Sequence, residues 1–170
     1  EAKHIQEKVL GKEHPNYAVS LQNLANVYLE MDNYEKAEPL FLEAKHIQEK
    51  VLGKEHPNYA MCLSNLAILY KNMGNYEKAE PIYLEAKTIQ EKVVGKEHPD
   101  YAWCLNSLAM LYKNMGNYEK AEPLYIEAKT IQEKVLGKEH PDYAKSLGNL
   151  ASLYERQNRF AESVPLLTQK

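Results

Sequence analysis

The candidate catalytic or metal-binding residues in this sequence are four glutamate-histidine pairs, a set of tyrosines and two cysteines. The pairs lie in the string GKEHP, which begins at Gly11, Gly53, Gly95 and Gly137. A Glu-His pair can transfer a proton, and it can supply ligands to a metal ion. A metal site needs three or four ligands that converge at about 2 Å. These histidines lie one per string, 42 residues apart, so we expect structural roles at helix starts.

The tyrosines and cysteines also follow the repeat. All 13 tyrosines occupy repeat-equivalent positions, so none is singled out as a catalytic acid or base. Cys62 and Cys104 share one position, which Ser20 and Ser146 fill in the other copies. Equivalent positions of stacked helices lie about 8–10 Å apart, beyond the ~7 Å that a disulfide spans. We therefore expect reduced thiols and a cytoplasmic protein, and no enzyme, cofactor or metal ion.

The composition is that of a soluble globular protein. The chain has 170 residues, 44% of them hydrophobic and 26% charged, with a net charge of −3. This balance gives no basic face for nucleic acid, and no apolar run approaches the ~18 residues that span a membrane. The chain begins at Glu1 without an apolar leader, so we expect a fragment without a targeting signal.

Each 42-residue unit predicts two helices, which we name the A helix and the B helix. Pro15, Pro57, Pro99 and Pro141 suit the first turn of an A helix of about 17 residues. Pairs such as Gly74-Asn75 end it, and a B helix of about 19 residues follows. Connections of two residues within a unit, and of four or five between units, make neighbouring helices antiparallel. Neither helix can bury its apolar side alone, so the units must stack into a solenoid.

The spacing of the apolar residues resembles that of the tetratricopeptide repeat. The matching residues in the first full copy are Leu21, Leu24, Ala25, Tyr28, Ala37, Phe41 and Ala44. The 42-residue period and the loop at residues 52–57 are similar to the kinesin light chain branch of this family. The resemblance implies an all-α, right-handed superhelical solenoid of antiparallel helix pairs, in which the A helices line a concave groove that binds peptides.

We expect one solenoid over residues 1–170. Residues 1–10 match the second half of a B helix, and 11–52, 53–94 and 95–136 are full repeats. The last repeat, 137–170, stops inside its B helix. A different class of function is therefore self-assembly, in which these half helices of successive chains meet head to tail. The plainer alternative is that flanking sequence is missing.

One face of the A helix changes between copies while the other is constant. Residues 53–94 and 95–136 differ at eight of 42 positions. Four of the changes start at Met61/Trp103 and follow the helical spacing i, i+3, i+4 and i+7, so they form one stripe. The constant residues, such as Leu63 and Tyr70, have the same spacing on nearly the opposite face. We interpret the constant face as core and the changing face as a recognition surface, although neutral drift or padding between A helices would also change it.

With one further turn of polar residues, this stripe supplies the candidate peptide-binding residues. They are Val19, Gln22, Asn23, Asn26, Met61, Ser64, Asn65, Ile68, Lys71, Asn72, Trp103, Asn106, Ser107, Met110, Lys113, Asn114, Lys145, Asn149, Ser152 and Arg156. Exposed apolar residues and tryptophan are typical of contact sites, and lysine could meet an acidic side chain. We expect a protein or peptide partner with apolar or aromatic residues beside acidic ones. Modules that hold chaperone tails use an asparagine that survives here only as Asn26, so that partner is not expected.

Overall fold

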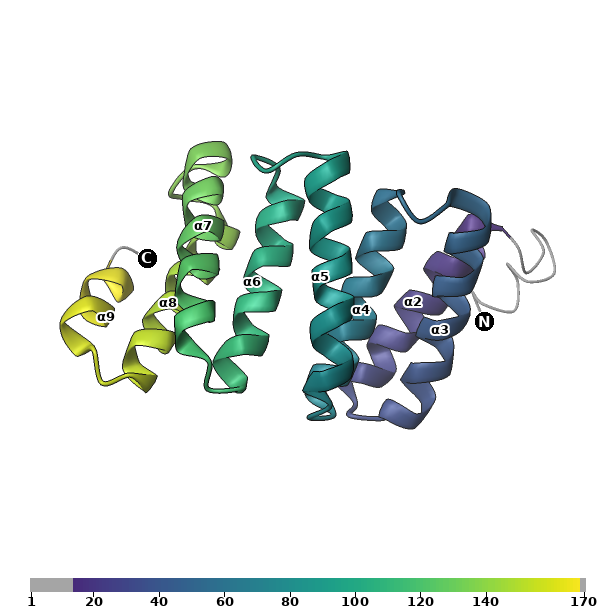
Figure 1. The fold of residues 1–170 in the computed structure, drawn as a ribbon, viewed down its shortest axis with the longest axis horizontal. Helices are drawn as coiled ribbons and strands as arrows, with labels where there is room; N and C mark the ends of the chain where they lie inside the picture. The colour runs from purple at the N-terminus through teal and green to yellow at the C-terminus, as the bar shows by residue number, and fades with distance from the viewer. Residues whose placement is uncertain (1–13, 169–170) are drawn as a thin grey trace. The chain divides into compact units, whose positions relative to one another are not determined.

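The structure, a computed structural model, describes residues 14–168, and every regular element in that range is an α-helix (Figure 1). The helices are α2 (Pro15–Glu30), α3 (Tyr34–Leu52), α4 (Pro57–Asn72), α5 (Tyr76–Val93), α6 (Pro99–Asn114), α7 (Tyr118–Leu136), α8 (Pro141–Arg156) and α9 (Phe160–Leu167). Even-numbered helices are A helices and the odd-numbered ones are B helices. The all-α fold of helix pairs is confirmed.

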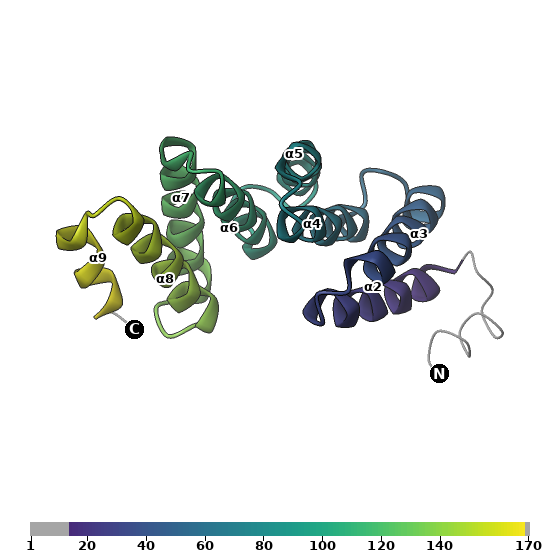
Figure 2. The same cartoon turned by 90° about the horizontal axis from the view of Figure 1, so that it is seen from below.

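The contacts between helices divide the chain into two compact units, with the boundary between Ile89 and Gln90. We name them the N-terminal unit and the C-terminal unit. In the first, α2 packs on α3 and α3 packs on α4. In the second, α6 packs on α7, α7 on α8 and α8 on α9. The pairs α2–α3 and α8–α9 lie side by side in both views (Figures 1 and 2). Each unit thus presents two A helices that also touch, α2 with α4 and α6 with α8.

Each A helix begins at a His-Pro pair. The four histidines are His14, His56, His98 and His140, and each is an N-cap in extended conformation. Each Nδ1 accepts a hydrogen bond of 3.1 Å from the backbone N–H two residues later. Because a residue before proline is held extended, the cap conformation follows from the sequence. The helix-start role predicted for these histidines is confirmed.

A compact turn joins each A helix to its B helix. Gly74 takes φ 74°, and the N–H of Asn75 donates to Tyr70 O at 2.8 Å. These are features of a helix end closed by a left-handed residue. The side chain of Asn75 then accepts from the N–H of Lys78 at 3.2 Å and starts the next helix. The connection has three residues rather than the predicted two, because Met73 caps α4 instead of extending it.

The constant face of the A helices forms the core. In the N-terminal unit, Tyr17 and Leu21 of α2 pack with Ala44 and Ile47 of α3. In the C-terminal unit, the corresponding cluster includes Tyr101, Leu105, Ala128 and Ile131 of α6 and α7. The constant residues Leu63, Leu66, Ala67 and Tyr70 are all at most 6% exposed. The opposite, changing face is therefore the one left for contacts other than the core.

Candidate binding surface

The residues predicted to line a groove differ widely in exposure. The exposed ones are Val19, Asn23, Met61, Asn72, Asn114, Lys145 and Arg156. Those half-buried are Asn26, Asn65, Ile68, Trp103, Asn106, Met110, Lys113, Asn149 and Ser152. The buried ones are Gln22, Ser64, Lys71 and Ser107. The stripe therefore contains both packing residues and surface residues.

In the N-terminal unit, part of the stripe holds the A helices together. The amide of Asn65 on α4 donates to Gln22 Oε1 on α2 at 3.4 Å. Ser64 is fully buried, and its hydroxyl donates to Ala60 O one turn earlier at 3.1 Å. For Gln22 and Asn65, variation between copies thus reflects padding between adjacent helices, one of the alternatives that the sequence left open.

In the C-terminal unit, Asn106 also links two A helices, but its partner is a serine instead of a glutamine. Its amide donates to Ser146 Oγ on α8 at 2.7 Å, and Ser146 in turn donates to Gln132 Oε1 on α7. Ser107 is buried and donates to Trp103 O at 3.0 Å. This chain of hydrogen bonds joins three helices and uses the side of Asn106 that faces α8. The cysteine position, occupied here by Ser146, therefore contributes a polar link in this repeat.

The apolar side chains of the stripe remain at the surface. Val19 and Met61 of the N-terminal unit are 42% and 46% exposed. Trp103 and Met110 of the C-terminal unit are half-buried. Trp103 and Met110 lie seven residues apart, so they share one side of α6. Each unit therefore exposes apolar surface on the face of its A helices that is not core.

Basic side chains adjoin this surface in the C-terminal unit. Lys113, in the last turn of α6, donates from Nζ to Ser152 Oγ on α8 at 3.2 Å. Arg156 lies one helical turn beyond Ser152 and is exposed. Burial lowers the pKa of Lys113, and the nearby positive charge of Arg156 lowers it further. Two cations thus lie close together at the end of the stripe.

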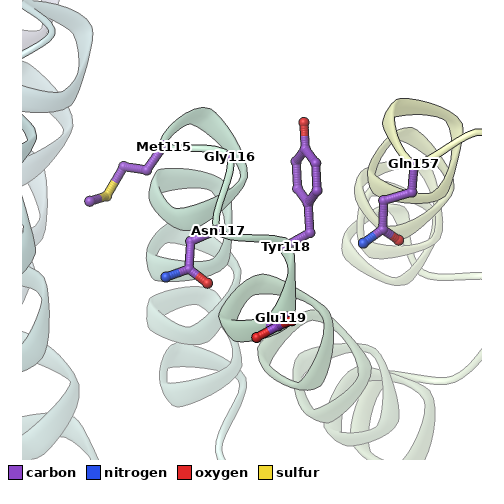
Figure 3. A pocket seen from close by; sticks show the side chains of 6 residues that line it. All are labelled: Met115, Gly116, Asn117, Tyr118, Glu119 and Gln157. Atoms are coloured by element: carbon purple, nitrogen blue, oxygen red, sulfur yellow. The ribbon is translucent and has the colours of Figure 1, made fainter.

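Sequence reasoning missed an open pocket of about 500 Å³ at the turn between α6 and α7. Met115, Gly116, Asn117, Tyr118, Glu119 and Gln157 line it (Figure 3). In the first repeat the equivalent Tyr34 hydroxyl donates to Asp32 at 2.7 Å. Gly116 replaces that aspartate, so Tyr118 has no carboxylate at the equivalent position. The exchange of Asp32 for glycine between copies was the available sequence signal.

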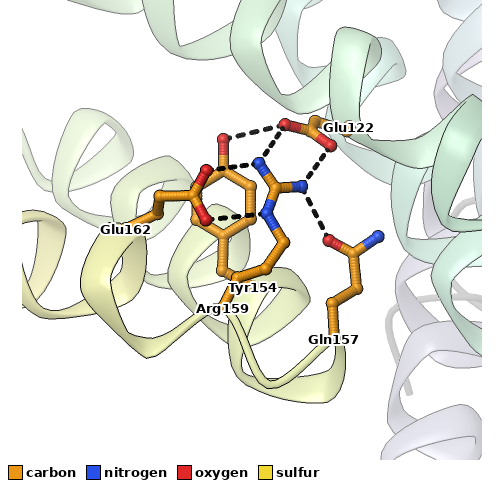
Figure 4. A network of polar contacts seen from close by, with 5 residues as sticks. All are labelled: Glu122, Tyr154, Gln157, Arg159 and Glu162. Carbon is orange, nitrogen blue, oxygen red and sulfur yellow. Dashed lines mark hydrogen bonds and ion pairs between the residues drawn. The ribbon is translucent and has the colours of Figure 1, made fainter.

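Sequence reasoning also missed the polar network around Arg159 (Figure 4). The guanidinium donates to Glu122 on α7 at 2.7 Å and to Glu162 on α9 at 2.6 Å, and it lies 4.2 Å from the ring centroid of Tyr154. Hydrogen bonds from Arg159 are the main reason that the pKa of Glu122 is lowered. Arg159 replaces the capping asparagine found at Asn117, and that substitution was the visible signal. The network joins three helices rather than binding a ligand.

Burial raises the pKa of cysteine and tyrosine side chains in the core. Burial raises the pKa of the Cys62 thiol to about 12, and it raises the pKa of the Tyr101 hydroxyl to about 12 as well. Cys62 and Cys104 are both buried thiols. Between residues 14 and 168, no three histidine, cysteine or acidic side chains gather as a metal site would require. Over the same range, no helix is long and apolar enough to cross a membrane.

A sequence model of the tetratricopeptide repeat matches residues 1–50, 23–86, 63–122 and 106–169 of the chain. Two similar solved structures are a putative kinesin light chain from Podosopora anserina with nearly identical TPR-like repeats and a glutamine-to-methionine variant of it. Both are 31% identical to this chain, with TM-scores of 0.75 and 0.78 respectively. The alignment covers 98% of this chain and 79% of each of them.

A more distant structure shares the fold alone. BtubC (BKLC) from P. vanneervenii has a TM-score of 0.79 at 21% identity. The match covers 92% of this chain and 63% of that one, so the chain spans less than two thirds of this relative's length. A search of curated protein sequences finds no match.

Proposed function

Because the chain belongs to the tetratricopeptide repeat family, we propose that it is a non-enzymatic scaffold that binds a partner protein or peptide along its A helices. The A helices would line the concave side of a right-handed superhelix. The partner would lie against the surface residues of the stripe, which excludes the buried Ser64 and Ser107 from direct contact. The buried thiols of Cys62 and Cys104 suit the reducing cytoplasm, where we place the protein.

One observation carries this proposal: apolar side chains stay exposed on a face that the core does not use. Met61 is 46% exposed, although its neighbours Cys62 and Leu63 are at most 1% exposed. Exposed apolar groups of this kind mark contact sites, and tryptophan and methionine are enriched in interfaces. Trp103 and Met110 make the corresponding surface in the C-terminal unit.

The polar residues beside this surface indicate the chemistry of the partner. Lys113, Lys145 and Arg156 line the stripe of the C-terminal unit and attract an acidic segment. Asparagine amides, such as that of Asn149, can hold the backbone of an extended peptide because they both donate and accept. The expected ligand is therefore an extended peptide with apolar or aromatic residues among acidic ones.

Fluorescence of Trp103, the only tryptophan, tests the proposal directly. Titration with acidic-aromatic peptides is expected to change its emission saturably, whereas the same peptides with lysine at the acidic positions are not. Met110→Ala is expected to weaken binding about tenfold, which is the usual scale for a central apolar contact. Met115→Ala is the matched control, since Met115 is 42% exposed but lies at a turn outside the stripe. Equal weakening by both variants would rule out the stripe as the docking surface.

A second candidate function is head-to-tail self-assembly, favoured by the apolar surface of α9. Leu167 is 41% exposed, whereas Phe41 and Tyr125 at the equivalent position are fully buried. Phe160 and Val164 on the same helix are both 58% exposed. A second copy of the chain would cover this surface. Residues 1–10, which the sequence also assigns to such a joint, lie outside the described residues.

Sedimentation at increasing protein concentration separates the two functions. Self-assembly predicts a mass that grows with concentration and returns to that of a monomer in Leu167→Lys. The peptide scaffold predicts no such growth, with Trp103 still responding to peptide. A constant monomer mass in the unsubstituted chain would exclude the assembly.

A further inference from the structure

Lys113 on α6 and Arg156 on α8 form a basic pair at the end of the stripe. Lys113 is half-buried, and its Nζ donates a hydrogen bond to Ser152 Oγ at 3.2 Å. Within residues 14–168, no ion pair joins a carboxylate to Lys113 or Arg156. Arg159 in the same unit contrasts with them, because Glu122 and Glu162 both contact its guanidinium. The pair is thus a local excess of positive charge.

The repeat fold does not require this pair. The position of Arg156 is held by Glu30, Asn72 and Asn114 in the other copies, all of which form the same A helix. A basic residue in the last turn does stabilise a helix through its dipole, but that effect needs no burial. Burying an ammonium group beside another cation costs free energy. The lowered pKa of Lys113 reports that cost, which an anion between the two side chains would relieve.

We propose that Lys113, Ser152 and Arg156 bind the phosphate group of a phosphorylated serine or threonine in the partner peptide. The inference rests on the proposed function, because it places one residue of the peptide on the stripe. A phosphate monoester carries about −1.5 to −2 charges and three acceptor oxygens. It therefore matches two cations and a hydroxyl, whereas a carboxylate balances only one charge. Lys113 keeps free N–H donors after its bond to Ser152, and arginine offers five.

The position of the pair also predicts the spacing of the peptide. Trp103 and Lys113 are ten residues apart on α6, which is about 15 Å along the helix axis. An extended peptide covers about 3.3 Å per residue, so about four or five residues span that distance. The partner is expected to carry an apolar or aromatic residue about that far from the phosphorylated residue.

Three peptide libraries with random flanks test the inference, with phosphoserine, glutamate or serine fixed at the centre. The phosphoserine library is expected to be retained at least tenfold better than the serine library and several-fold better than the glutamate library. Lys113→Gln and Arg156→Gln are expected to remove that preference. Lys138→Gln, which removes an exposed lysine paired with Glu133 at 3.3 Å, is the charge-matched control. Circular dichroism checks that Lys113→Gln still folds, and Ser152→Ala tests the site without changing its charge.

Other patterns of peptide retention would contradict the phosphate site or the peptide scaffold. Equal retention of the phosphoserine and glutamate libraries would overturn the assignment to phosphate. Equal retention of all three, with apolar residues still selected in the flanks, would overturn the anion site and leave the peptide scaffold standing. Retention without selection at any position would overturn both. Loss of the phosphoserine preference in Lys138→Gln would show a non-specific charge effect and contradict the site.

Discussion

Tyr70 Oη on α4 donates a hydrogen bond to Glu38 Oε1 on α3 at 2.8 Å, and this bond joins one repeat to the next. The equivalent bond in the C-terminal unit runs from Tyr154 to Glu122 at 3.1 Å. Repetition of the pair in both units shows that it belongs to the stacking of the repeats. We expect Tyr70→Phe to lower the free energy of unfolding by about 1 kcal/mol, the usual net value of such a bond. Urea unfolding followed by circular dichroism measures it.

At Tyr125, replacing tyrosine by phenylalanine is expected to have the opposite effect on stability. Its ring is fully buried, and its hydroxyl has no hydrogen-bond partner within the described chain. Phe41 occupies the equivalent position in the first repeat, also fully buried. Removing an unsatisfied buried hydroxyl relieves a desolvation cost, so Tyr125→Phe is expected to leave the stability unchanged or to raise it by up to about 1 kcal/mol. A loss as large as that of Tyr70→Phe would show that the hydroxyl has a partner.

The buried tyrosines predict alkaline unfolding. Burial and, secondarily, the bond to Glu38 raise the pKa of Tyr70 to about 12, and burial raises that of Tyr101 to about 12. An unfolded tyrosine has a pKa of about 10. The stabilising contribution is therefore complete below pH 10 and is lost as the pH rises toward 12, because only the unfolded chain releases these protons.

Absorbance at 295 nm and helical circular dichroism, recorded together from pH 9 to 13, check this expectation. The exposed tyrosines are expected to ionise first without loss of helix, and the buried ones together with unfolding. Complete ionisation below pH 11 in a chain that remains helical would contradict it.

Replacing a histidine cap is expected to lower the stability, and asparagine at the same position is expected to recover most of it. His98 Nδ1 accepts the N–H of Asp100 at 3.1 Å at the start of α6. His98→Ala leaves that N–H without its acceptor and is expected to cost about 1 kcal/mol of unfolding free energy. His98→Asn supplies a side-chain oxygen to the same N–H and is expected to recover most of the loss. Thermal unfolding of the two variants side by side gives the comparison, and equal losses would argue against capping.

Two residues with positive φ at the A–B turns, Gly116 and Asn158, are expected to respond to substitution with opposite changes in stability. Gly116 has φ 77°, and a Cβ built there meets nothing within 4 Å. Gly116→Ala is therefore expected to cost about 1 kcal/mol through backbone strain alone. Asn158 has φ 59° at the equivalent position, so Asn158→Gly is expected to cost nothing or to stabilise slightly. Chemical denaturation measures the free energy of unfolding of both variants. A loss of stability in both would argue against backbone strain and for lost contacts.

The helices and the core could be predicted from the amino-acid sequence alone. The signals that set them are local: a His-Pro pair starts each A helix, and a residue such as Gly116 ends it with a positive φ. Apolar residues at helical spacing place the same face inward in every copy, as Leu63 and Leu66 show. Because local geometry and burial repeat every 42 residues, one copy was enough to predict the others.

Which of the changing residues pack between helices and which lie at the surface could not be predicted from the sequence. Gln22 and Asn65 are 43 residues apart in the chain, and their bond exists only because α2 packs beside α4. Arg159 breaks the repeat pattern at the start of α9, yet it pairs with Glu122 on α7, 37 residues earlier in the chain. Such contacts depend on the distance and rotation between neighbouring helices. A periodic pattern specifies the inward face of each helix, but it does not specify which side chains on two helices meet.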